Sequence, residues 1–417
     1  MNILLIGGGG REHALAYAIA ASPLLDRLYC APGNPGTGQL GENVTLDIGD
    51  HDAVAQFCRA NQIGLVVVGP EAPLVAGIVE SLAARGIKAF GPSAAAAQLE
   101  GSKGFTKDLC AKAGIPTAAY HRFKDQEAAL KHVSDRGAPL VVKLDGLAQG
   151  KGVTVAETMP EAIAAVRQAF SSASDCAIVI EDRLVGPELS FFALCDGRHV
   201  LPLSTAEDYK RAGDGDTGPN TGGMGAFSPS RLADPALEAR VLDEIIRPTL
   251  GALDDMGIPY RGVLYAGLML TPEGPKLIEY NVRFGDPECQ VLMLRLKDDI
   301  VTLMLAAVDG VLDTMSARFH DEAALTVVMA AKGYPGKVEA GSVIRGLAAA
   351  DELDQVVVFQ AGTRRDGENL VASGGRVLNV TATGPTLEAA RQRAYKAVSL
   401  IDFPGGFYRR DIGKQPR

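Results

Sequence analysis

LIEYNVRFGDPE, residues 277–288, begins as an apolar β-strand and ends in a dense group of polar and charged side chains. Because strand side chains alternate between two faces, Glu279 and Asn281 point to one face, and Arg283 continues on it. Two oxygen donors on one face suit Mg²⁺ held together with substrate phosphates. A guanidinium beside them can clamp a phosphate or a carboxylate. The alternative interpretation is a cluster of surface salt bridges.

The segments before this stretch have the pattern of an α+β unit. A helix is expected at 102–114, and the apolar runs at 139–146, 152–158, 177–184 and 189–195 predict strands, with one helix between them at 159–170. A glycine-rich loop at 213–225 leads to a long helix at 235–257 and to strands at 262–270 and 276–282.

The first hundred residues repeat a short apolar run, a Gly/Pro loop and a helical pattern. Strands are expected at 2–6, 28–30, 65–68 and 88–90, and helices at 12–20 and 73–86. This alternation is typical of an open parallel sheet with helices on its faces, which binds ligands at the carboxyl ends of its strands.

After a helix at 298–312, the rest of the chain is β-rich with one helix at 386–401. A chain of 417 residues has room for about three domains. We therefore predict an N-terminal α/β domain at 1–102, a central domain at 103–323 and a C-terminal α+β domain at 324–417.

The composition is that of an ordinary folded protein, with 47% hydrophobic and 22% charged residues. A net charge of −9 disfavours a nucleic-acid partner. The six cysteines form no C-x-x-C pair, so we expect reduced packing residues and no zinc site. The sequence shows neither a signal peptide nor a membrane-spanning run, and we expect a cytoplasmic protein without a membrane partner.

LLIGGGGREHALA, residues 4–16, invites a dinucleotide-binding interpretation that its spacing rejects. Glu12 or His13 stands where the third glycine of G-x-G-x-x-G is needed, and the second strand ends in APGN without an acidic residue for a ribose. The remaining possibility is an anion held by backbone N–H groups, together with the loop GPEAP at 69–73. Two tight strand-to-helix turns are the alternative.

KLDGLAQGKG, residues 143–152, is not a Walker A loop. The spacing from Gly146 to Gly150 is one residue too short, and Gly152 replaces the Ser or Thr that would hold magnesium. A glycine-rich turn that contains Lys151 can instead cover phosphates from above. Lys143 lies on a strand, where it faces either an anion or solvent.

Two further segments carry weaker signals. In AIVIEDRLVGPELS, residues 177–190, Glu181 ends an apolar strand and could accept from the amine of a purine, although an ordinary charged strand end fits equally well. In the loop at 213–225, Asp214, Asp216 and Asn220 suit an ammonium group, whereas the six glycines favour a flexible linker.

Taken together, these motifs closely resemble the glycinamide ribonucleotide synthetase family of ATP-grasp ligases. The resemblance covers essentially the full length, in the order of the family. It rests on the segments GGGGREHALA (7–16), APGNPG (31–36), VVGPEAPL (67–74), FGPS (90–93), QLEGSKGFTK (98–107), KLDGLAQGKGV (143–153), DTGPNTGGMGAFSP (216–229), EYNVRFGDPE (279–288) and FYRRDIG (407–413).

The resemblance implies a central ATP-grasp fold, with a small ATP-covering subdomain at about 117–190. It implies that ATP phosphorylates glycine, and that 5-phosphoribosylamine then attacks glycyl phosphate to give glycinamide ribonucleotide, ADP and phosphate. The cofactors would be ATP and Mg²⁺ or Mn²⁺. The only partners would be these small molecules, and the protein would be a monomer or a weak dimer.

The family's residue roles can be carried over to matching positions. ATP would be bound by Lys103, Lys143, Gly146, Gly150, Lys151, Gly152, Glu181, Leu184 and Glu188. The metal ligands would be Glu279 and Asn281. Glycine and the acyl phosphate would meet Asp216, Asn220, Arg283 and Asp286. Substrate binding would further involve Gly9, Gly10, Arg11, Glu12, His13, Gly69, Pro70, Glu71 and Glu288.

Three departures from the family pattern receive no role: Leu144 and Gln149 replace alanines, and Tyr209 replaces a frequent histidine. Strand 262–270 also lacks the carboxylate that many ATP-grasp enzymes use as a further metal ligand, which leaves the number of metal ions open. The alternative functions are another ATP-grasp carboxylate-amine ligase of purine metabolism, a nucleotide-binding regulator without turnover, and, in third place, a nicotinamide-dependent oxidoreductase.

Overall fold

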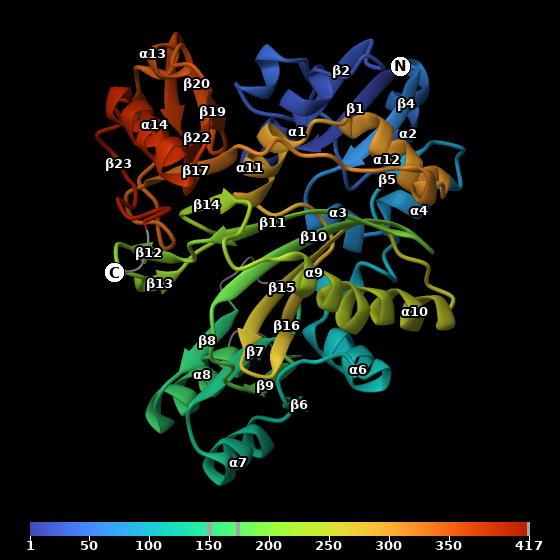
Figure 1. Cartoon of the computed structure of the whole chain (residues 1–417), viewed down its shortest axis with the longest axis vertical. Helices are drawn as coiled ribbons and strands as arrows, with labels where there is room; N and C mark the ends of the chain where they lie inside the picture. The colour runs from blue at the N-terminus through green and yellow to red at the C-terminus, as the bar shows by residue number, and fades with distance from the viewer. Residues whose placement is uncertain (148–151, 172–175, 415–417) are drawn as a thin grey trace.

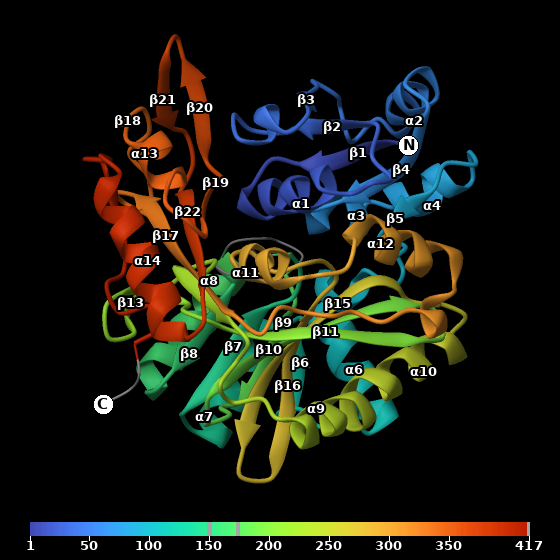
Figure 2. The same cartoon turned by 45° about the horizontal axis from the view of Figure 1, so that its top comes forward.

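The computed structural model of the chain describes residues 1–147, 152–171 and 176–414. Figure 1 shows the N-terminal part (blue) beside the C-terminal part (red), both above a layer of long central strands, with a small α/β unit below. Figure 2 turns the top forward and shows the C-terminal strands standing next to the N-terminal sheet. The multidomain fold expected from the sequence is confirmed.

The N-terminal part is an open parallel sheet with strand order β3-β2-β1-β4-β5. Its strands are β1 (Asn2–Gly7), β2 (Arg27–Pro32), β3 (Glu42–Asn43), β4 (Ile63–Val68) and β5 (Ala89–Phe90). Its helical segments are α1 (Gly10–Ala20), η1 (Thr37–Gln39), α2 (His51–Ala60), α3 (Glu71–Val75) and α4 (Ile78–Ala83). The loops after the adjacent strands β1 and β4 therefore open at the same edge.

The helix expected at 73–86 is interrupted. Gly77 adopts a φ of 86°, a left-handed conformation that separates α3 from α4. The sequence pattern is helical on both sides, so the periodicity alone does not reveal the break.

The small unit is an antiparallel sheet, with strand order β6-β9-β7-β8 and two helices. Its elements are β6 (Tyr120–Phe123), α7 (Gln126–Arg136), β7 (Leu140–Leu144), β8 (Val153–Ala156), α8 (Met159–Ser171) and β9 (Ile178–Asp182). It has its own hydrophobic core. It is preceded by α5 (Gln98–Gly101) and α6 (Lys103–Ala113).

One long sheet connects the central part to the C-terminal part, in the order β16-β15-β10-β11-β14-β17-β22-β19, with β23 also paired to β17. The strands are β10 (Glu188–Asp196), β11 (Val200–Asp208), β14 (Gly225–Ser228), β15 (Arg261–Thr271), β16 (Gly274–Asn281), β17 (Ala323–Ala331), β19 (Val356–Gln360), β22 (Arg376–Gly384) and β23 (Gly406–Phe407). The short strand β14 joins the two halves by pairing with β11 on one side and β17 on the other.

The remaining elements surround this sheet. The strands are β12 (Arg211–Gly213), β13 (Thr217–Asn220), β18 (Val343–Ile344), β20 (Thr363–Asp366) and β21 (Asn369–Ala372). The helical segments are α9 (Pro235–Val241), η2 (Leu242–Ile246), α10 (Arg247–Asp255), α11 (Glu288–Arg295), α12 (Ile300–Asp309), η3 (Leu312–Thr314), α13 (Leu347–Asp351) and α14 (Leu387–Leu400).

The helix expected at 235–257 contains a π-helical turn, η2, between α9 and α10. Pro248 follows that turn, and its ring nitrogen cannot donate to the carbonyl four residues earlier. The wider turn accommodates this missing hydrogen bond.

None of the helices in the described residues is long and apolar enough to cross a lipid bilayer. All six cysteines are buried and free, in agreement with their predicted packing role.

The edge strand β19 is covered by side chains of the N-terminal part. The backbone N–H of Gln360 donates to His13 Nδ1 at 2.8 Å, and Asn34 Nδ2 donates to the Gln360 carbonyl at 2.8 Å. The ring of His13 also packs edge-on against Phe359, with ring centroids 5.4 Å apart. These contacts require a neutral imidazole, because a protonated Nδ1 cannot accept a hydrogen bond.

Burial lowers the pKa of His13 from 6.5 to about 4. As the pH falls, the unfolded chain therefore binds this proton before the folded chain does. Neutral His13 contributes fully to stability above about pH 6.5, and this contribution is lost as the pH falls toward about 4. Between pH 7 and pH 5, we expect the wild type to lose roughly 2 kcal/mol more unfolding free energy than a His13→Asn variant.

Urea denaturation at both pH values and constant ionic strength measures this difference. The control is His320→Asn, which removes an exposed imidazole and should keep the wild-type pH dependence. Equal losses in the wild type and His13→Asn would contradict the assignment.

Candidate active site

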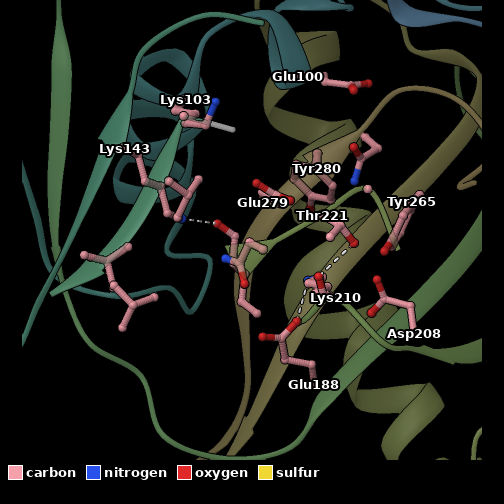
Figure 3. Close-up of a pocket in the computed structure, with 18 of the residues that line it drawn as sticks. Glu100, Lys103, Lys143, Glu188, Asp208, Lys210, Thr221, Tyr265, Glu279 and Tyr280 are labelled. Carbon is pink, nitrogen blue, oxygen red and sulfur yellow. Dashed lines mark hydrogen bonds and ion pairs between the residues drawn. The ribbon is translucent and has the colours of Figure 1, made fainter. Parts of the chain in front are cut away.

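A cavity of about 770 Å³ lies where the small unit, the long sheet and the N-terminal loops meet. The central part of the chain contributes residues of α6, β7–β13, β15 and β16 to its walls, and the C-terminal part contributes Tyr334, Gly375 and Arg376. In Figure 3, Lys103 and Lys143 lie on one side of this cavity, Tyr265 and Asp208 lie on the other, and Glu279 lies between them.

The side chains of Glu279 and Asn281 share one face of β16. Glu279 lies opposite Gly267 and Asn281 lies opposite Tyr265 in the neighbouring strand β15. Glycine at position 267 places no side chain beside Glu279, so the face is open toward the cavity. The register confirms that the two oxygen-bearing side chains point the same way, as their spacing indicates.

Glu279 is surrounded by cations. Burial alone would raise the pKa of its carboxyl, but Lys143, Lys210 and Lys103 outweigh it and hold the pKa below the ordinary value. Glu279 is therefore an ionised carboxylate at neutral pH. In the described residues, no group of three or more His, Cys, Asp or Glu side chains could hold a metal ion by itself.

A buried ion-pair network lies behind the lysines. Glu181 Oε2 is 3.1 Å from Lys107 Nζ, and Oε1 is 3.0 Å from Lys143 Nζ. Lys143 also donates to the Ile278 carbonyl of β16 at 3.1 Å. Lys107 donates to Thr117 Oγ1 at 2.6 Å. One carboxylate thus fixes two ammonium groups between α6, the small sheet and β16.

A second charged group lines the opposite wall. Lys210 forms an ion pair with Glu188, whereas no hydrogen bond or ion pair of the Asp208 carboxyl is found in the described residues. Burial raises the pKa of Asp208 to about 7, and the charges of Glu288 and Glu188 add to this against the opposing effect of Lys210. Tyr265 donates to Glu288 Oε1 at 2.8 Å.

Arg283 links the end of β16 to the N-terminal part of the chain. Its Nη2 donates to Glu100 at 2.9 Å and its Nε donates to Glu71 at 3.3 Å. Glu100 also accepts from the backbone N–H of Val282 at 2.8 Å. The guanidinium is therefore held at the cavity wall by two carboxylates.

Asp286 lies where all three parts of the chain meet. Its carboxylate accepts from the backbone N–H of Arg11 at 3.3 Å and from Gln290 Nε2 at 3.0 Å. It also lies 3.5 Å from the guanidinium of Arg376. The charges of Arg376 and Arg11 keep the pKa of Asp286 below its usual value, although burial opposes them. The start of α1 is therefore already occupied by a carboxylate of the chain itself.

Models of phosphoribosylglycinamide synthetase match almost the whole chain: the N domain at residues 1–100, the ATP-grasp (A) domain at 101–289 and the C domain at 324–415. The chain belongs to the phosphoribosylglycinamide synthetase family. This confirms the resemblance inferred from the sequence, since glycinamide ribonucleotide synthetase is another name of the family.

Curated relatives in this family are similar over the full length. A phosphoribosylamine--glycine ligase of Mesorhizobium japonicum is 60% identical and covers 100% of this chain and 98% of its own length. One from Escherichia coli is 50% identical, with 99% and 98% covered. The crystal structure of phosphoribosylamine--glycine ligase from Thermotoga maritima is 34% identical, with a TM-score of 0.86 over 99% of this chain and 100% of that one.

The structure brings most of the family's expected site residues to the cavity wall. The ATP-binding candidates at the wall are Lys103, Lys143, Gly146, Gly152, Glu181, Leu184 and Glu188. The metal and substrate candidates at the wall are Arg11, Pro70, Glu71, Asn220, Glu279, Asn281, Arg283, Asp286 and Glu288. Gly150 and Lys151 lie outside the described residues.

Six candidates from the family motifs do not line the cavity: Gly9, Gly10, Glu12, His13, Gly69 and Asp216. Glu12 is directed back into its own loop, where it accepts from the Gly9 N–H at 2.7 Å and from Arg11 Nε at 2.6 Å. Asp216 lies at a hairpin tip, 2.8 Å from Arg409. Glu12, His13 and Asp216 thus support neighbouring elements. The predicted substrate contacts of all six positions remain predictions.

Sequence reasoning missed several cavity residues. Asp208 and Lys210 flank Tyr209 at the end of β11 and line the cavity. Like β16 with Glu279, β11 is a strand that ends in charged residues, and this pattern could have identified them. Lys107 lies four residues after Lys103 and thus on the same face of α6. Arg376 reaches the cavity from the C-terminal part, and no sequence pattern around it predicts that position.

The Glu181 network leads to a stability prediction. In a Lys107→Met variant, the buried carboxylate loses one of its two cations, and breaking a buried ion pair typically costs about 3 kcal/mol or more. We expect a decrease of this size in the unfolding free energy, measured by urea denaturation. Lys112→Met, an exposed position on the same helix, should change it by less than about 0.5 kcal/mol. Equal stability of the two variants would contradict this account.

Proposed function

We propose that the chain is an ATP-dependent ligase that joins glycine to 5-phosphoribosylamine through glycyl phosphate. The products are glycinamide ribonucleotide, ADP and phosphate. The observation that carries the proposal is the face of β16. In a chain that matches the family over its full length, this face carries the carboxylate of Glu279 and the amide of Asn281. Both line the same cavity as Lys103 and Lys143.

The donors at this face fit a divalent metal. Glu279 and Asn281 supply hard oxygen atoms, and two protein ligands completed by water and substrate phosphates are the usual arrangement for Mg²⁺. A bound Mg²⁺ or Mn²⁺ would supply positive charge that neutralises the phosphate oxygens of ATP. No larger protein cage is needed for that role.

The main electrostatic barrier is the approach of a carboxylate to a triphosphate. Two like charges about 4 Å apart repel by roughly 4 kcal/mol at an effective dielectric constant near 20. Lys103, Lys143 and Arg283 line the cavity, and their positive charges would offset this repulsion. The loop from Gly146 to Gly152 would cover the phosphates.

The contacts to adenine, ribose and glycine can be assigned to residues that line the cavity. The backbone from Glu181 to Leu184 would bind adenine, since the Glu181 carboxylate is engaged by two lysines, and Glu188 would bind the ribose hydroxyls. Arg283, Asp286 and Asn220 would hold glycine and its acyl phosphate. The amine substrate would then attack directly, so orientation replaces a covalent protein nucleophile.

The phosphoribosylamine would lie at the N-terminal loops, beside Arg11, Pro70, Glu71 and Glu288. We further propose a cytoplasmic protein, monomeric or weakly dimeric, with domain boundaries near residues 102 and 323. The choice between Mg²⁺ and Mn²⁺ belongs to the same proposal.

Trapping the acyl phosphate tests the function. With ATP, Mg²⁺, glycine and hydroxylamine but without phosphoribosylamine, we expect glycine hydroxamate and ADP to form in equal amounts. Alanine or aspartate in place of glycine is the control and should give little product. Hydroxamate formation that does not depend on glycine, or ADP release with another carboxylate only, would point to a different ligase.

Replacing the metal-binding carboxylate should abolish most of the turnover. We expect Glu279→Ala to lower the rate of ADP formation on the order of a hundredfold or more, in a protein that still unfolds cooperatively on heating. Glu273→Ala, an exposed carboxylate in the turn before β16, is the matched control and should keep wild-type activity. A Glu279→Ala enzyme as active as this control would exclude the metal assignment.

A further inference from the structure

The β12–β13 hairpin begins and ends at the cavity, but its tip does not. Lys210 and Arg211 enter it, and Asn220 and Thr221 leave it, and all four line the cavity wall. The tip, residues 214–216, is exposed. A two-stranded hairpin has little stability of its own in water, so the placement of its base requires an external support.

The support comes from the last described segment of the chain, which binds the hairpin tip. Arg409 Nη1 donates to Asp216 Oδ1 at 2.8 Å and to the Arg211 carbonyl at 3.0 Å. The backbone of Arg410 donates to Asp214 Oδ1 at 2.8 Å. The N–H of Gly215 donates in return to the Asp411 carboxylate at 2.9 Å.

Arg409 is itself rigidly held. Its side chain is 1% exposed, and Asp411 accepts from Nε at 2.8 Å and from Nη2 at 2.7 Å. The guanidinium also lies 4.9 Å from the centre of the Tyr209 ring. Tyr209 directly precedes Lys210 in the chain. Bidentate pairing and stacking fix the plane of a guanidinium, so Arg409 is a fixed point for the hairpin.

The C-terminal part also holds the segment that leaves the hairpin. The N–H of Gly222 donates to the Tyr334 hydroxyl at 2.9 Å, and Arg376 Nη1 donates to the Gly222 carbonyl at 2.6 Å. Both ends of the hairpin segment are therefore fixed by residues that lie more than a hundred positions later in the chain.

The placement of Asp216 gives this residue a different role from direct substrate contact. Its side chain is 69% exposed, does not line the cavity and is paired with Arg409. Its φ of 56° is left-handed, a conformation that is uncommon outside glycine and that the surrounding contacts must maintain.

We propose that Arg409 is a positioning residue of the active site. Through Asp216 and the Arg211 carbonyl, it holds the β12–β13 hairpin so that Lys210, Asn220 and Thr221 face the substrates. The inference deepens the proposed function and rests on it for its kinetic consequence, whereas the anchoring of the hairpin can be measured without turnover.

The first variant is Asp216→Asn, which removes the negative charge of the exposed partner, keeps an oxygen that can accept from Arg409, and leaves Arg409 paired with Asp411. The second is Arg409→Met, and the third combines both changes. The matched control is Arg410→Met, which removes a neighbouring positive charge whose side chain makes no recorded hydrogen bond or ion pair in the described residues. Thermal unfolding of each protein establishes that it is folded.

Hydrogen exchange measured by mass spectrometry reports the anchoring. We expect the amides of residues 211–221 to exchange about tenfold faster in Arg409→Met, which loses the contacts to both Asp216 and the Arg211 carbonyl. The increase in Asp216→Asn should be about twofold, and Arg410→Met should exchange at the wild-type rate. Wild-type exchange in both Asp216→Asn and a folded Arg409→Met would overturn the proposal, whether or not the protein has the proposed activity.

Steady-state kinetics separate positioning from a general loss of folded protein. We expect Arg409→Met to raise the KM for glycine about fivefold or more, and Asp216→Asn to raise it less. The Kd for ATP, whose phosphates and adenine would lie mainly against the small unit, should change less than about twofold. In the double variant the effect should equal that of Arg409→Met alone, because both changes act through one contact. Additive effects would mean that Asp216 contacts a substrate independently, and would overturn its role through Arg409.

Discussion

Most of the cations that line the cavity are paired with carboxylates of the chain before any ligand arrives, and the site depends on this pairing. Buried cations need partners, and the chain supplies them. The pairs are Lys107 and Lys143 with Glu181, Lys210 with Glu188, Arg283 with Glu71 and Glu100, and Arg376 with Asp286. In the proposed reaction, the triphosphate would take the place of these carboxylates beside the lysines and arginines, and the divalent cation would bind beside Glu279. The ligands would thus enter a cavity whose cations already have partners.

The fold, and the shared face of Glu279 and Asn281, could be predicted from the sequence. Alternation along β16 identifies the shared face of Glu279 and Asn281, because strand periodicity is a local property. The parallel sheet at residues 1–90 follows from its repeated pattern in the same way. By contrast, the break at Gly77 and the π-turn before Pro248 are invisible to periodicity, since the flanking residues keep a helical pattern.

The parts that could not be predicted are mostly contacts between distant segments. Arg376 reaches the cavity from β22, and Asp216, which the family motif suggests for substrate contact, forms an ion pair with Arg409 away from the cavity wall. His13 likewise follows a glycine-rich loop but accepts from Gln360 of the C-terminal part. A motif shows that a residue occupies a family position, whereas the group that its side chain contacts depends on tertiary packing.

The four residues of β14 have a consequence for the order in which the protein can be completed during synthesis. β14 pairs with β11 on one edge and with β17 on the other. Until the ribosome has produced residues 323–331, the second edge of β14 exposes backbone donors and acceptors without a strand to receive them. The sheet under the active site is therefore finished only late in translation, and the nascent chain carries an open strand edge during that interval, when it is most prone to pair with other chains.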